Sequence, residues 1–139
     1  MVGIDTRERV GAMYAAYVGS DFKTVAELIH PDIDWMIYSP MTIFPFAGHR
    51  RGRVQVLEAM AGIAESYKLD SYVTEWIIVD GDSAAVMSDA GFVQRATKRN
   101  LRFRLADFLR FKDGRLIEFR EFANTFDVVE QALGRELAL

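Results

Sequence analysis

Residues 101–125 read LRFRLADFLRFKDGRLIEFREFANT, two runs of alternating apolar and polar residues on either side of Lys112-Asp113-Gly114. An Asp-Gly pair between two such runs is a strong signal for a β-hairpin. We predict a three-residue loop with Gly114 in the left-handed conformation, which pairs Phe111 with Arg115. A two-residue turn would instead place Asp107 opposite Arg120 and mix the two faces, so the longer loop is favoured.

The predicted register gives the hairpin one face that is apolar apart from two carboxylates. This face carries Phe103, Leu105, Asp107, Leu109, Ile117, Phe119, Glu121 and Ala123. The opposite face is rich in arginine and carries Arg102, Arg104, Ala106, Phe108, Arg110, Glu118, Arg120, Phe122 and Asn124.

Two acids on an apolar face are unfavourable unless they are partnered or protonated, and burial together raises their pKa values. Asp107 and Glu121 are therefore candidates for general acid–base catalysis. The alternative interpretation is structural, because ion pairs in proteins also perturb acids. In that case Asp107 caps a loop or pairs with an arginine, and Glu121 lies at a solvated strand end.

Composition places the 139 residues in one globular domain, 1–139, with half of its residues apolar and a net charge of −3. The chain lacks the basic excess that binding to nucleic acid requires. It contains no cysteine, which excludes disulfides and thiolate metal sites. Charged residues interrupt the first 17 positions where a signal peptide would be apolar, and no run is long enough to span a bilayer. We expect a cytoplasmic protein without membrane contact.

Two helices are predicted at the N-terminal end. Asp5 and Glu8 form a capping box ahead of the first, which ends at Gly19-Ser20-Asp21. The second runs over residues 22–29 and stops at His30-Pro31. Tyr14 and Tyr17 lie on the first helix, where their rings are core residues unless a hydroxyl reaches a cavity.

The rest of the chain alternates little between helix and strand. We predict a strand over 32–38, an apolar loop folded back over 39–52, and a helix over 53–67 with Val54, Leu57, Met60, Ala61 and Ala64 on its buried stripe. A hairpin over 72–79 and 84–95, the hairpin described above and a helix over 126–134 follow. Segregated helices and strands of this kind predict an α+β fold with helices on one face of a curved antiparallel sheet.

In this order the elements resemble the nuclear transport factor two superfamily, which includes ketosteroid isomerases, SnoaL-like polyketide cyclases and limonene epoxide hydrolase. The resemblance lies in the helix ending Gly-Ser-Asp, in His30-Pro31-Asp32 before a strand with Trp35, and in residues 45–48 and Gly52 before the third helix. It extends to residues 112–117 and to Arg120-Glu121-Phe122. It implies a cone-shaped curved sheet wrapped around the N-terminal helices, an apolar pocket and a homodimer formed through the outer sheet face.

The resemblance also suggests roles for single residues. Asp107 matches the isomerase acid that donates a hydrogen bond to the developing enolate, and Glu121 matches the catalytic acid in the last strand of limonene epoxide hydrolase. Tyr14 lies one position from the isomerase's helical tyrosine. The isomerase's proton-shuttling acid follows the first strand, where this chain has residues 37–40 and no acid. SnoaL-like cyclases require an acid–base group and an apolar pocket without a cofactor.

Other side chains are candidate ligands or pocket residues. His49, among Arg50, Arg51 and Arg53, is expected in solvent, as is that arginine cluster, although it lies where an anion can bind at a helix N-terminus. His30 is expected to cap a helix C-terminus, and no metal-ligand spacing is present. The pocket residues expected to bind substrate are Tyr17, Trp35, Tyr38, Phe44, Phe46, Met60, Trp76, Leu105 and Phe119.

The sequence thus supports two hypotheses. The first is a cofactor-independent isomerase, cyclase or hydrolase for a small apolar, carbonyl-bearing or cyclic substrate. In it Glu121 is the general base, Asp107 is a neutral hydrogen-bond donor and Tyr14 assists. The second is a dimeric module of the same fold that binds an apolar ligand without catalysis.

Overall fold

The computed structural model describes residues 2–139, with only the backbone described for residues 2–5. Six strands form one curved sheet in the order β2-β1-β6-β5-β4-β3. The elements are α1 (Val2–Val18), α2 (Phe22–Leu28), β1 (Ile29–Ile37), β2 (Gly48–Arg51), α3 (Arg53–Ser66), β3 (Tyr67–Asp80), β4 (Ser83–Gln94), β5 (Asn100–Lys112), β6 (Arg115–Phe122) and α4 (Thr125–Leu133). The α+β class and the curved sheet beside N-terminal helices are therefore confirmed.

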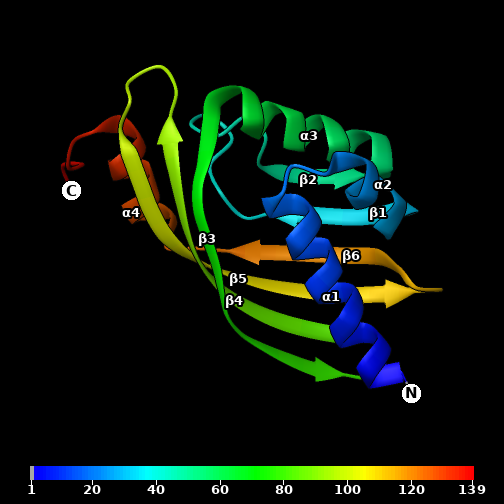
Figure 1. Ribbon diagram of the computed structural model, residues 1–139. Coiled ribbons are helices and arrows are strands. Elements are labelled where there is room, and N and C mark those ends of the chain that lie inside the picture. Colours follow the sequence, from blue (N-terminus) through cyan, green and yellow to red (C-terminus); the bar gives the residue numbers. More distant parts are fainter. Residues whose placement is uncertain (1) are drawn as a thin grey trace.

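The long strands β3, β4 and β5 bend around α1 and α3, and the sheet stays open (Figure 1). All neighbouring strands are antiparallel except β1 and β6, which are parallel. This parallel pair brings the end of β1 beside the end of β6, with Ile37 opposite Glu121. The exception matters for the site because it joins the N-terminal half of the chain to the C-terminal hairpin.

The register of the β5–β6 hairpin differs from the prediction along its whole length, whereas the two faces agree with it beyond the turn. Lys112 pairs with Arg115, so Asp113 and Gly114 form a two-residue turn, both with positive φ. The register then shifts between Arg110 and Phe111, where Phe111 pairs with Leu116 and Arg110 with Glu118. This β-bulge leaves Ile117 without a partner and restores the predicted faces beyond it. Leu116, which is 1% exposed, takes the core position predicted for Ile117.

Bulges also explain why Trp76 lies outside the core. The pairing of β3 with β4 is irregular between Leu69 and Ser71 and again between Thr74 and Trp76. Each irregularity reverses which side of the sheet the following residues face. The first reversal turns Tyr72 toward the core. The second reverses the strand again, so Ile77 and Val79 pack on the core and Trp76 is half exposed.

The strand β2 lies where the sequence predicted a loop, and β1 begins three residues before the predicted start. Pro31 is accommodated because the β1–β6 pairing is irregular between Ile29 and Asp34. His30 is consequently a strand residue and not a helix cap, and its Nδ1 accepts a hydrogen bond from the Asp32 N–H at 3.0 Å.

The helices differ from prediction mainly at their ends. Asp21 caps α2, with the Thr24 N–H donating to its carboxylate at 3.2 Å. The helix α1 begins before Asp5, so the predicted capping box is not at its start, and the side chain of Asp5 lies outside the described part of the structure. In α3 the buried residues are Val56, Ala59 and Met60, and Val54 of the predicted stripe is exposed.

Candidate active site

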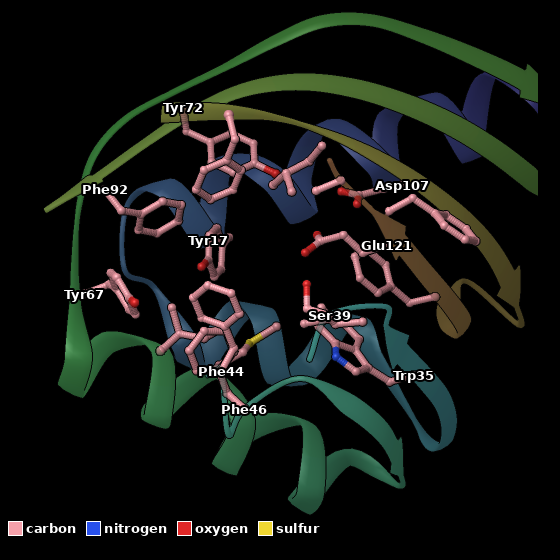
Figure 2. A pocket seen from close by; sticks show the side chains of 18 of the residues that line it. Tyr17, Trp35, Ser39, Phe44, Phe46, Tyr67, Tyr72, Phe92, Asp107 and Glu121 are labelled. Atoms are coloured by element: carbon pink, nitrogen blue, oxygen red, sulfur yellow. The ribbon is translucent and has the colours of Figure 1, made fainter. Parts of the chain in front are cut away.

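The site is built on the pairing of β5 with β6, which places Asp107 directly opposite Glu121. Side chains at paired positions point to the same face of a sheet, and here that face is the concave, apolar one. Asp107 is 1% exposed. In Figure 2 the two carboxyl groups lie next to each other on one side of a cavity.

The cavity has a volume of about 130 Å³ and lies between the sheet and the helices. Its lining is almost entirely apolar or aromatic. The sequence-predicted residues that line it are Tyr14, Tyr17, Trp35, Phe44, Phe46, Met60, Leu105, Asp107, Phe119 and Glu121. The structure thus brings together ten of the twelve residues proposed for the site.

Tyr38 and Trp76 are the two exceptions, and both lie on the opposite, outer side of the sheet. Tyr38 is 40% exposed and stacks on Phe122, with ring centroids 4.4 Å apart. Trp76 faces outward because it follows the second bulge of β3. Neither side chain lines the cavity.

Tyr14 of α1 holds Asp107 in place. Its hydroxyl donates to Asp107 Oδ2 at 2.5 Å, a length typical of an O–H group bonded to an ionised carboxylate. The other oxygen, Oδ1, is buried and has no donor among the described groups other than the Glu121 carboxyl when that is protonated. Asp107 therefore sits between one tyrosine and one acid, without an arginine partner.

Burial governs the ionisation of the pair. It raises the pKa of Asp107 to about 6, although hydrogen bonds from Glu121 and Tyr14 act in the opposite direction. Burial also raises the pKa of Glu121 well above its usual value, and the adjacent Asp107 raises it further. Two carboxyls this close share one proton near neutral pH. Glu121 is the member that holds it, because the Tyr14 hydroxyl stabilises the ionised form of Asp107.

Sequence reasoning missed three polar residues of the cavity, Tyr67, Tyr72 and Ser39. Burial raises the pKa of Tyr72 well above its usual value, and the nearby carboxyls of Asp107 and Glu121 raise it further. The alternation of strand β3 would have indicated Tyr72, had the two bulges not obscured it. Ser39 directs its hydroxyl toward Glu121 in Figure 2. It is placed there because the N–H of Tyr38 donates to the Glu121 carbonyl oxygen at 3.0 Å.

The histidine and arginine residues near β2 lie outside the cavity. His49 is 44% exposed, and its Nε2 lies 2.6 Å from Asp34 Oδ1. Arg50 donates to the Pro45 carbonyl oxygen at 2.7 Å, and Nε and Nη2 of Arg53 both donate to the Ile29 carbonyl oxygen. These contacts fix the loop to the sheet, so Arg50 and Arg53 are structural residues and not merely solvated ones.

A metal-binding cluster and a membrane-spanning helix are both absent from the described part of the chain. No group of three or more His, Asp and Glu side chains there is arranged to hold a metal ion. None of the described helices has the length and apolar character needed to cross a membrane.

Comparison with solved structures shows where this architecture recurs. The chain is 38% identical to a protein of Rhodopseudomonas palustris that carries a provisional isomerase name, with a TM-score of 0.84 over 94% of this chain and 97% of the other. An NTF2-like protein of Burkholderia xenovorans is 20% identical, with a TM-score of 0.82 over 95% and 98%. A limonene-epoxide-hydrolase-like epoxide hydrolase of M. tuberculosis is 15% identical, with a TM-score of 0.77 over 95% and 92%.

Comparison of the sequence with known proteins finds a matching family and no curated relative. The profile of the SnoaL-like domain matches residues 10–119. No curated protein matches the chain. The profile spans the elements from α1 to β6 and therefore includes both Asp107 and most of the cavity.

Proposed function

Because the chain belongs to the family of SnoaL-like domains, whose fold the structure shares, we propose that it is an acid–base enzyme for a small apolar, carbonyl-bearing or cyclic substrate. The observation that carries this proposal is the register pair Asp107 and Glu121, two buried acids at the wall of an apolar cavity. Pairs of titratable groups whose pKa values are driven apart by their surroundings are a common basis of acid–base catalysis. The proposed reaction is an isomerisation, a cyclisation or a hydrolysis, and proton transfer by the pair requires no cofactor.

The hydrogen bond from Tyr14 stabilises the ionised form of Asp107 and so favours roles opposite to those expected from the sequence. Glu121 keeps its proton and is the general acid, whereas Asp107 is the ionised member and the general base. Tyr14 then orients the Asp107 carboxylate through Oδ2. A base with a pKa near 6 is mostly ionised at neutral pH and still basic enough to accept a proton.

In an isomerisation, Asp107 takes a proton from the carbon next to a carbonyl while Glu121 gives its proton to the carbonyl oxygen. The substrate becomes a neutral enol, and the pair still holds one proton and one negative charge. Asp107 then returns its proton to a different carbon as the enol returns its O–H proton to Glu121. In a hydrolysis, Asp107 instead takes a proton from the attacking water and Glu121 protonates the leaving oxygen.

The experiment that tests this proposal measures proton transfer without knowledge of the natural substrate. Exchange of the α-protons of cyclohexanone in D₂O, conversion of 3-cyclohexenone to its conjugated isomer and hydrolysis of cyclohexene oxide are followed for wild type, Asp107→Asn and Glu121→Gln. We expect either substitution to lower the enzyme-dependent rate by about 10²–10⁴-fold. Glu75→Gln is the matched control, because Glu75 pairs with Arg104 outside the cavity and its loss should leave the rate unchanged.

Equal rates in wild type and both variants would contradict the acid–base proposal. Binding of these compounds without any enzyme-dependent rate would favour the other hypothesis, a module that holds an apolar ligand.

We also propose that the outer sheet face joins two copies of the chain. Register places Ile78, Ala85 and Phe108 in one row across β3, β4 and β5, and Trp76, Met87 and Ala106 in the next. Several of these side chains are large, apolar and about half exposed, namely Trp76, Ile78 and Phe108. Ion pairs at the margin of the patch, such as Arg102 with Asp89, leave its rim polar and its centre apolar, as in many protein interfaces.

A further inference from the structure

The cavity holds a negative charge that no described cation balances. Asp107 accepts a short hydrogen bond from a neutral tyrosine, and its other neighbour is an acid. None of the described residues that line the cavity is lysine, arginine or histidine. Arg120 is next to Glu121 in sequence, but its guanidinium lies on the outer face, where it contacts Asp34 and Glu118. A buried charge without a partner is unfavourable, so the described lining alone leaves the cavity electrostatically incomplete.

Among the described residues, every other titratable group that faces the pair is a tyrosine. Tyr14 and Tyr17 approach from α1 and Tyr72 from β3. Burial and the neighbouring carboxyls raise the pKa of each of them, so all three remain neutral at physiological pH. They cannot compensate the charge on Asp107 and can only donate hydrogen bonds to it.

The remaining walls present aromatic rings. Tyr14 and Tyr72 lie 5.9 Å apart between centroids, Tyr17 and Tyr72 lie 6.0 Å apart, and Trp35 stacks on Phe119 at 4.0 Å. On the side of the cavity opposite the two carboxyl groups, Figure 2 shows Phe44, Phe46, Tyr67 and Phe92. The faces of aromatic rings attract cations, most strongly where water is excluded. The carboxylate and the surrounding aromatic side chains therefore both favour a positively charged ligand.

The volume limits how large such a ligand is. An engineered cavity of about 150 Å³ in another protein takes up benzene. The cavity of about 130 Å³ in this protein therefore accommodates a ligand of about the size of one aromatic ring.

We infer that the cavity selects a small apolar cation, a ring-sized amine that is protonated at neutral pH, over neutral and anionic compounds of the same shape. The inference rests on the proposed function in one respect: it takes the ligand to be the substrate of that function, bound beside the Asp107–Glu121 pair. It adds a basic nitrogen to the carbonyl-bearing or cyclic substrate. The nitrogen balances the charge of the pair while the ring packs against the aromatic walls.

Three probes of similar shape test the inference by calorimetry or NMR titration of the full chain at neutral pH. Benzylamine is cationic, ethylbenzene is its neutral isostere and phenylacetate is anionic. We expect benzylamine to bind at least about tenfold more tightly than ethylbenzene. The contact between a cation and one aromatic ring already supplies a substantial part of the binding free energy that corresponds to a tenfold difference in affinity. We expect phenylacetate to bind more weakly than both.

The Asp107→Asn variant should remove most of the preference for benzylamine and leave the affinity for ethylbenzene unchanged. Asp89→Asn removes a negative charge on the outer face, where Asp89 pairs with Arg102, and should change neither affinity. The affinity of wild type for benzylamine should also rise as pH increases through the Asp107 pKa of about 6, because benzylamine stays protonated while the pair loses a proton.

Equal binding of benzylamine and ethylbenzene, tighter binding of phenylacetate, or no measurable binding of benzylamine would each overturn the inference. The pH dependence in wild type decides the matter if Asp107→Asn does not fold. The two proposals fail separately. Selective benzylamine binding without proton transfer would contradict the enzyme proposal alone, and proton transfer without charge selection would contradict the inference alone.

Discussion

Tyr14 on the first helix donates a hydrogen bond of 2.5 Å to Asp107 Oδ2, although 93 residues separate the two in sequence. The bond crosses the cavity-facing side of the sheet and joins α1 to β5. It stabilises the ionised form of Asp107 and is one of the interactions that lower its pKa. The hydroxyl of Tyr14 is therefore a determinant of when Asp107 can act as a base.

Replacing Tyr14 with Phe should raise the pKa of Asp107 above about 6, because burial would act with less opposition. The measurement is the ¹³C chemical shift of the Asp107 carboxyl as a function of pH. The acidic limb of any enzyme-dependent rate should move to higher pH by the same amount. Tyr38→Phe is the control, since Tyr38 is exposed and outside the cavity. An unchanged titration midpoint in Tyr14→Phe would show that the bond does not set the ionisation of Asp107.

The acid pair should also make the protein less stable as pH rises. Asp107 has a higher pKa when folded, about 6, than the ordinary 3.8. The folded state therefore binds more protons in that interval. The free energy of unfolding then falls between pH 4 and pH 6, by about 3 kcal/mol for Asp107 alone, and stays low above it. Glu121, whose pKa is also raised, extends the decline to higher pH.

Urea denaturation at several pH values between 5 and 8 measures the upper part of this decline, together with the contribution of Glu121. The interval avoids the acidic range in which Asp34 and Asp89 become protonated. Contacts with arginine lower the pKa of Asp89. At Asp34 burial raises the pKa, but contacts with histidine and arginine outweigh it and the pKa is lowered. Both residues therefore lose their stabilising contacts only as pH falls. Asp107→Asn should flatten the profile. A wild-type profile that rises steadily from pH 5 to pH 8 would contradict the raised pKa of the pair.

The alternation of residues 101–125 was enough to predict that Asp107 and Glu121 share an apolar face, because burying one face of a hairpin fixes the pattern. The register itself, in which Asp107 pairs with Glu121, was not predicted. A two-residue turn and a bulge after Leu116 together give the same face assignment as the predicted three-residue loop. Bulges leave almost no signal in one sequence, since they are stabilised by neighbouring strands.

The same limitation explains Trp76 and Tyr72. Both lie on β3, whose two irregularities reverse the facing of the residues that follow, so that a large aromatic residue points outward and a tyrosine inward. The strand β2 escaped prediction because it has four residues and is paired only at the edge of the sheet. Local pattern decides which residues are buried in a regular strand, and long-range pairing decides where the strand stops being regular.

The proposed dimer is tested on the outer face. Trp76→Glu places a charge at the centre of the apolar patch, where it would be desolvated in an interface, and should convert a dimer into a monomer. Sedimentation velocity gives the mass, and circular dichroism checks that the fold is kept. Val54→Glu is the control, since Val54 is 69% exposed on α3 and away from the patch. A monomeric wild type, or a Trp76→Glu variant that remains dimeric, would contradict the proposed interface.

The turn of the hairpin provides a test of how the register is held. Gly114 has φ +78, in the left-handed region, and a Cβ there would lie 2.7 Å from the guanidinium carbon of Arg9. That guanidinium donates a hydrogen bond to the Gly114 carbonyl oxygen at 2.9 Å. Gly114→Ala should therefore destabilise the protein by about 1–2 kcal/mol, the range for placing a side chain in this conformation. It should also weaken the contact between α1 and the turn.

Gly11→Ala makes the same chemical change with the opposite expected sign. Gly11 lies inside α1, and a Cβ there would meet nothing within 4 Å. Alanine is favoured over glycine in a helix interior by about 0.5–1 kcal/mol, so this variant should be more stable than wild type. Urea denaturation at one pH measures both changes. Equal effects of the two substitutions would mean that the left-handed turn does not hold the register that brings Asp107 to Glu121.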